Sequence, residues 1–122
     1  MKNGYYITSK GEKVDIIPLL ETRFNGRGIT ELVIPDGMEQ VYCHENKLTK
    51  LILADGVERV ICHNNKLTEL IIPEGVRTLE CDGNRFKEHL LLPKSIKRLW
   101  CDLGGIDLIK YKHSHIIMTL FA

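Results

Sequence analysis

VERVICHNNKLTELIIPEG, at residues 57–75, is the stretch of sequence that decides the fold. The stretch before it, MEQVYCHENKLTKLILADG at residues 38–56, has the same pattern. So does the stretch after it, VRTLECDGNRFKEHLLLPKS at residues 76–95, and a fourth, partial copy occupies residues 96–106. A pattern that recurs at one period predicts a solenoid of stacked, similar units.

The cysteines mark the period of this repeat. They follow one another at intervals of 19, 19 and 20 residues, as Cys43, Cys62, Cys81 and Cys101. A disulfide framework would imply an oxidising compartment, but such regular spacing indicates one cysteine in each structural unit. We therefore expect free, buried thiols that act as small apolar side chains.

Each copy fits the pattern apolar-x-x-apolar-x-Cys-x-x-Asn-x-apolar, with Gly104 in place of Asn in the fourth. This pattern resembles the leucine-rich-repeat signature L-x-x-L-x-L-x-x-N/C-x-L, with Cys in place of the third Leu. The resemblance covers about residues 29–106. It implies a right-handed leucine-rich-repeat solenoid with a short parallel β-sheet. Repeats this short are similar to those of bacterial effector proteins.

The segments that connect the copies alternate between apolar and polar residues, as in Leu-Thr-x-Leu-x-Ile-Pro. This alternation predicts extended returning limbs with little or no helix. Pro73-Glu74-Gly75 then predicts a turn in which Gly takes a positive φ. In the fourth turn of this kind Ser95 replaces that Gly.

One such unit cannot bury its own apolar face, so the core is expected to consist of columns of equivalent side chains. In the central copy the inward residues are Val57, Val60, Cys62, Leu67, Leu70 and Ile72. Asn46, Asn65 and Asn84 are expected to form another column, in which each amide pairs with backbone groups at the end of a strand.

Both ends of a solenoid require a cap. We expect an N-terminal cap at residues 1–28, made of a β-hairpin around residues 9–12 and a degenerate first coil. Four repeats follow at residues 29–105. A C-terminal cap at residues 106–122 is ambiguous between strand and helix.

Charge and hydropathy exclude some functions. Lys and Arg number 17 against 16 Asp and Glu, and a net charge of +1 argues against nucleic acid as a partner. No signal peptide is visible, and the apolar run at residues 116–122 is too short to span a bilayer. We expect no membrane association and a cytoplasmic location, or delivery into a host cell if the effector resemblance holds.

No catalytic residue and no cofactor is expected. An inward Cys81 would have its neighbour Asp82 on the opposite face of the sheet, so the two cannot act together. No C-x-x-C pair suggests a zinc site. In the effectors that the repeats resemble, ubiquitin-ligase chemistry belongs to a separate domain. The chain is therefore interpreted as a non-enzyme.

The outward face of the sheet is the candidate site. Alternation places three rows there, of which the middle row is unusually apolar and contains the only Trp of the chain. Aromatic and Arg side chains are typical of binding hot spots. The predicted partner-binding residues are Tyr42, His44, Arg59, Ile61, His63, Glu80, Asp82, Arg98, Trp100 and Asp102.

Three hypotheses of function follow. The first is a protein–protein interaction module, a binder or inhibitor that holds a partner protein on the concave sheet face, such as a bacterial effector or a phage or viral counter-defence protein. The second is a metal- or small-molecule-binding protein that uses the row of His44, His63 and Asp82. The third is a structural protein that forms homo-oligomers through its apolar C-terminal segment.

Overall fold

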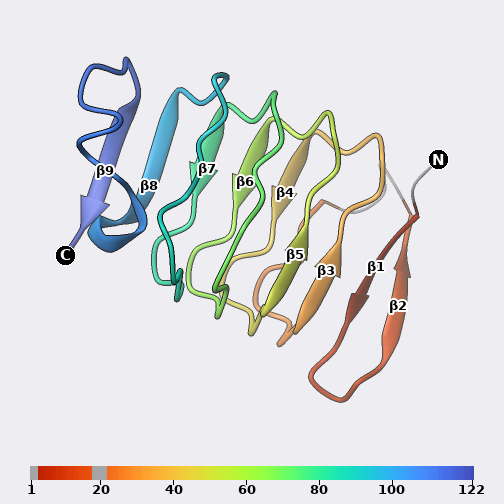
Figure 1. The fold of residues 1–122 in the computed structure, drawn as a ribbon. Coiled ribbons are helices and arrows are strands. Elements are labelled where there is room, and N and C mark those ends of the chain that lie inside the picture. Colours follow the sequence, from red (N-terminus) through yellow and green to blue (C-terminus); the bar gives the residue numbers. More distant parts are fainter. Residues whose placement is uncertain (1–2, 18–21) are drawn as a thin grey trace.

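The computed structural model describes residues 3–17 and 22–122 and shows a β-solenoid of about five turns, each of about 19 residues (Figure 1). The predicted solenoid, its parallel sheet and its extended returning limbs are confirmed. Within the described residues, helical backbone is confined to the short 3₁₀ turn η1 (Leu103–Gly105). None of the described segments forms a helix long and apolar enough to cross a membrane.

A five-stranded parallel sheet forms one side of the solenoid. Residues at the same position of consecutive repeats lie opposite one another, as Val60 does with Val41 and Leu79. A bridge between Arg23 and Tyr42 adds the first turn to this side. In spatial order the strands are β4 (Gln40–Tyr42), β6 (Arg59–Ile61), β7 (Thr78–Glu80), β8 (Arg98–Asp102) and β9 (Ile117–Phe121).

A second, mixed sheet forms part of the returning side. The N-terminal hairpin pairs antiparallel with the first returning limb and so covers this end of the sheet (Figure 1). Gly4 is required for this contact, because a Cβ there would lie 2.6 Å from the carbonyl oxygen of Val33. The strand order is β2 (Lys13–Ile16), β1 (Gly4–Ile7), β3 (Glu31–Val33), β5 (Lys50–Ile52). Residues 1–2 and 18–21 of the predicted cap lie outside the described residues.

The core is built of columns of equivalent side chains, as predicted. All four cysteines are free and have 0% exposure. Their thiols lie between apolar rows, so they fill space in the same way as the leucines around them. The predicted inward residues of the central copy are also buried: Val57, Val60, Cys62, Leu67, Leu70 and Ile72.

The asparagine column joins each turn to the one before it. The Oδ1 atom of Asn65 accepts a hydrogen bond from the N–H of Leu48 at 3.0 Å. Its Nδ2 atom donates to the carbonyl oxygens of Cys43 and Cys62 at 3.0 and 3.1 Å. Asn46 and Asn84 make the equivalent bonds. These amides satisfy backbone groups that the short strands leave without a partner.

The turns between repeats use glycine where the sequence predicts it. Gly37, Gly56 and Gly75 have φ values of 90°, 93° and 104°. Ser95, which replaces Gly in the fourth of these turns, has a different role. Its Oγ atom accepts a hydrogen bond from the N–H of Gly75 at 2.9 Å and donates one to the carbonyl oxygen of Val76 at 2.8 Å.

The C-terminal segment, which the sequence left ambiguous, ends in a strand. Turns occupy residues 108–113, and β9 then pairs in parallel with β8. Met118 and Leu120 pack against the core and continue the columns of Leu99 and Cys101. A strand forms here because this stretch repeats the alternation of the other strands.

Candidate functional site

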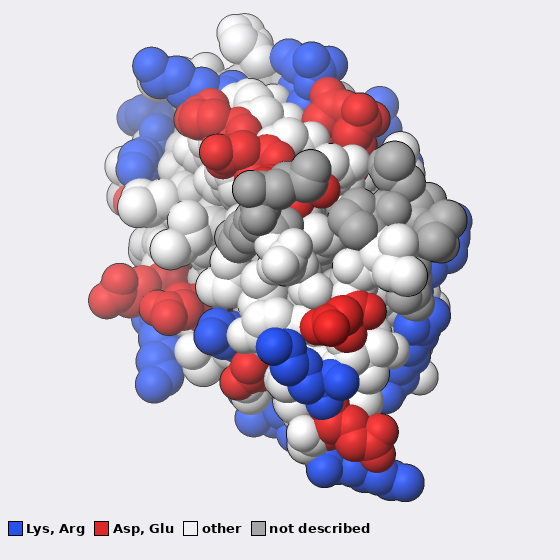
Figure 2. Space-filling model, turned by 90° about the vertical axis from the view of Figure 1, so that its right-hand side faces the viewer, with Lys and Arg blue, Asp and Glu red and all other residues white. Residues whose placement is uncertain are grey.

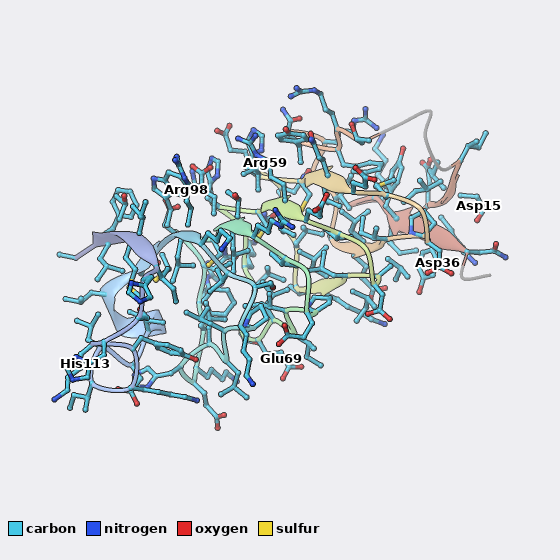
Figure 3. All side chains as sticks on the ribbon, turned by 90° about the horizontal axis from the view of Figure 1, so that it is seen from above. Asp15, Asp36, Arg59, Glu69, Arg98 and His113 are labelled. Atoms are coloured by element: carbon cyan, nitrogen blue, oxygen red, sulfur yellow. The ribbon has the colours of Figure 1, made fainter. Side chains whose placement is uncertain are left out.

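The outward side chains of the five-stranded sheet form one continuous surface, here called the strand face. Figure 3 shows Arg59 and Arg98 on one side of the solenoid and Glu69, from a returning limb, on the other. The register aligns the side chains of the strand face in three rows. They are Gln40, Arg59, Thr78, Arg98 and Ile117; Tyr42, Ile61, Glu80, Trp100 and Thr119; and His44, His63, Asp82, Asp102 and Phe121.

The last member of each row was not predicted. Ile117, Thr119 and Phe121 come from β9, whose sequence lacks the Cys and Asn that mark the other repeats. A signal was nevertheless present. The inward pair Met118-x-Leu120 has the same spacing as Leu99-x-Cys101. Alternation of this kind would have extended the rows by one strand.

Tyr42 is held between two arginines at the N-terminal end of the strand face. The guanidinium carbons of Arg23 and Arg59 lie 4.4 and 5.8 Å from the centroid of its ring. Its hydroxyl donates a hydrogen bond to Oε1 of Gln40 at 3.0 Å. Arg23 was missed, because it precedes the repeats and only the bridge to Tyr42 fixes its place. The ring is thus oriented from both sides.

Ile61 requires a correction. The sequence predicts an exposed anchor residue, but this side chain is only 5% exposed. It belongs to a central strand and lies opposite Tyr42 on one side and Glu80 on the other. Ile61 is therefore a buried part of the strand face and not an exposed contact. Trp100, in contrast, is half-buried and accessible to a partner.

Three residues of the third row, His44, His63 and Asp82, lie close to Glu80 of the middle row. The rings of His44 and His63 stack with their centroids 4.7 Å apart and their planes inclined by 14°. Nδ1 of His63 lies 3.6 Å from Oε1 of Glu80. Asp82 belongs to the same cluster. Asp102 does not, because its Oδ2 atom accepts a hydrogen bond from the N–H of Gly83 at 2.9 Å.

Burial sets the protonation of the groups in and beneath this face. It lowers the pKa of His44, and the neighbouring His63 lowers it further, so the imidazole of His44 is neutral at neutral pH. It also raises the pKa of the Cys62 and Cys81 thiols well above the usual value. A thiolate is therefore not formed at neutral pH. The cysteines lack the exposure and low pKa that nucleophilic catalysis needs.

The returning side carries apolar surface that the sequence analysis did not consider. Two successive returning limbs, residues 68–72 and 86–91, border a groove of about 680 Å³. Ile71 and Leu91 lie along it with exposures of 85% and 73%. Their positions were identifiable as the outward residues of the returning limbs, but their exposure depends on the spacing between limbs.

No protein-family model, curated protein or solved structure matches this chain. Its class is therefore defined by architecture: a short β-solenoid whose strand face carries oriented aromatic and basic side chains beside a cluster of histidines and carboxylates.

Proposed function

We propose that this chain is a short leucine-rich-repeat protein that binds a protein partner through its strand face, as a non-enzymatic binder or inhibitor. The observation that carries the proposal is the arrangement around Tyr42, whose ring is held between Arg23 and Arg59. The repeat signature supports the family. The short repeats and their resemblance to bacterial effectors favour a decoy or counter-defence protein that acts in a host cell.

A pre-oriented aromatic ring favours binding because little side-chain entropy remains to be lost when the partner arrives. Trp, Tyr and Arg are also the residues most enriched among binding hot spots. Tyr42 and Trp100 are the proposed anchors, and both lie in the middle row. Arg59 and Arg98 in the neighbouring row, and Glu80 in the same row as the anchors, would set the orientation of the partner.

Charge favours a protein over nucleic acid as the partner. The net charge of the chain is +1. In Figure 2, which views the N-terminal end, basic and acidic side chains are interspersed on the face that is shown. Nucleic-acid binding by counterion release needs basic groups gathered on one face. Mixed charges instead suit a partner with a complementary mixed surface.

The test is binding by surface variants. A partner captured with the tagged chain from the organism that encodes it is purified, and its affinity is measured by isothermal titration calorimetry. We expect Tyr42→Ala with Trp100→Ala to weaken binding by 100-fold or more, because each hot-spot anchor contributes about 2 kcal/mol or more.

The matched control is Ile71→Ala with Leu91→Ala on the returning side, which should bind with unchanged affinity. Loss of binding in this control together with full binding by the strand-face variant would contradict the proposal. Circular dichroism of both variants verifies that they are folded.

A second candidate function is self-association, which the edge strand β9 favours. Ile117 and Phe121 on this strand are 63% and 43% exposed, and an apolar edge strand is a template for pairing with another chain. If this function holds, Ile117→Lys should convert a dimer into a monomer in sedimentation equilibrium. A wild-type chain that is monomeric at high concentration would exclude this candidate.

A further inference from the structure

We infer that His63, Glu80 and Asp82 bind one divalent transition-metal ion of the zinc class. This inference goes beyond the proposed protein binding and requires no partner. It rests on the geometry of three neighbouring strands and on the unsatisfied polar atoms that they carry.

The ligand atoms are close enough for one ion. One nitrogen of His63 and one oxygen each of Glu80 and Asp82 all lie within 4.8 Å of one another. His44 and Glu45 form a second group of this kind, and His63 belongs to both. A tetrahedral zinc ion with bonds of about 2.0–2.1 Å needs ligand atoms about 3.3 Å apart. Small side-chain rotations supply that difference.

Three polar atoms in this cluster make no hydrogen bond. The Nδ1 atoms of His44 and His63 and the Oδ1 atom of Asp82 are buried and make no hydrogen bond. Within residues 3–17 and 22–122 they are the buried side-chain nitrogen and oxygen atoms without a hydrogen bond. Buried polar groups are normally paired, and each exception calls for an explanation such as an ion. One bound ion would satisfy the atoms of His63 and Asp82.

The donor set selects the kind of ion. One imidazole and two carboxylates are a mixed nitrogen and oxygen set, which suits Zn²⁺ and its neighbours in the transition series. Ca²⁺ and Mg²⁺ prefer oxygen ligands alone. The two negative charges would balance the charge of the ion. The thiols of Cys62 and Cys81 belong to the buried inward column and are not part of the site.

The backbone holds the site in place. Tyr42, Ile61 and Glu80 are aligned by the parallel register, which fixes the residues that follow them in the third row. Backbone hydrogen bonds continue past the strand ends. The N–H of Glu45 donates to the carbonyl oxygen of His63, and the N–H of Asn64 donates to the carbonyl oxygen of Asp82. The ligands are therefore presented by a scaffold that exists before the ion binds, which favours affinity.

The test uses the full-length chain, purified and stripped of metal with a chelator. We expect calorimetric titration with Zn²⁺ to show one ion per chain. Titration with Co²⁺ should produce a visible absorption band of the intensity typical of tetrahedral coordination. His63→Ala and Asp82→Asn should each weaken Zn²⁺ binding at least 10-fold and remove the Co²⁺ band.

Two exposed histidines outside the site provide the matched controls. His89→Ala and His115→Ala should leave both the stoichiometry and the Co²⁺ band unchanged. Circular dichroism of each variant verifies folding, and added Zn²⁺ should raise the melting temperature of the wild type but not that of His63→Ala.

Three results would overturn the inference. The first is that Zn²⁺ produces no heat and Co²⁺ produces no absorption band. The second is full metal binding by His63→Ala, and the third is loss of metal binding in Cys62→Ala while His63→Ala still binds. The first would mean that water satisfies the unpaired atoms. Because Tyr42→Ala with Trp100→Ala should bind Zn²⁺ like the wild type, failure of the metal site and failure of the protein-binding face can be told apart.

Discussion

The free energy of unfolding should fall steeply as the pH rises above about 9, by about 4 kcal/mol per pH unit from the thiols of Cys43, Cys62 and Cys81 alone. The cause is the column of buried thiols. Burial raises the pKa of the Cys43, Cys62 and Cys81 thiols well above the usual value of a cysteine. In the unfolded chain the same thiols ionise near pH 8.5. Above that pH the unfolded state loses protons that the folded state keeps, so alkali favours unfolding.

The sign and the range follow from these values. A group whose pKa is raised by folding contributes its full stability below the unfolded pKa and loses it as the pH rises. Each thiol contributes about 1.4 kcal/mol per pH unit. Burial raises the pKa of Cys101 to about 11. This thiol therefore adds to the loss of stability only between its pKa in the unfolded chain and about pH 11.

Urea unfolding under reducing conditions between pH 7 and pH 10.5 measures this effect. The matched variant is Cys62→Ala, which removes one titrating group from the column. Its slope should be smaller than that of the wild type by about 1.4 kcal/mol per pH unit. Ionisation of tyrosine and lysine affects both chains equally and cancels in the difference. Equal slopes for the two chains would contradict the thiol mechanism.

Asn65→Ala should lower the free energy of unfolding by about 3–4 kcal/mol, because it leaves several buried backbone groups without partners. The N–H of Leu48 loses its acceptor, and the carbonyl oxygens of Cys43 and Cys62 lose a donor. Each unsatisfied buried group costs about 1–3 kcal/mol, and the exchange with water recovers part of the total. Urea unfolding at pH 7 measures the loss.

The neighbouring asparagine is the control. Asn64 is exposed and has a φ of 56°, a left-handed conformation that glycine also accepts. Asn64→Gly should therefore change stability by less than about 1 kcal/mol. Asn65→Asp keeps the acceptor and loses both donor hydrogens, so it should also be strongly destabilised. A small effect at position 65, similar to that at position 64, would show that the column does not join the turns.

The inward half of this fold was predictable because it depends on a period. Cys62 and Asn65 recur with their neighbours at fixed spacing, and alternation along a strand then determines which residues point inward. The glycine turns were predictable for the same reason, since Gly75 stands where a positive φ is needed. These features are local in the sequence and repeat in every turn.

The outward half was less predictable because it depends on the size and direction of neighbouring side chains. The rows were derived correctly, but the burial of Ile61, which lies between Tyr42 and Glu80, does not follow from alternation. The contact of Arg23 with Tyr42 depends on a first turn without the repeat signature. The unpaired atoms of His44 and His63 depend on side-chain rotation, which no period determines.

The register between equivalent residues also limits how such a chain can change in length. Removal of residues 57–75 as a block would join Gly56 to Val76, the same kind of junction as the present one between Gly75 and Val76. Every inward column would be preserved, and His44 would become the neighbour of Asp82. A deletion of one residue within a strand would instead move its apolar side chains to the solvent face. Lineages of this protein should therefore differ in size by whole turns. Each turn gained or lost would add or remove one strand, and with it one residue from each row of the strand face.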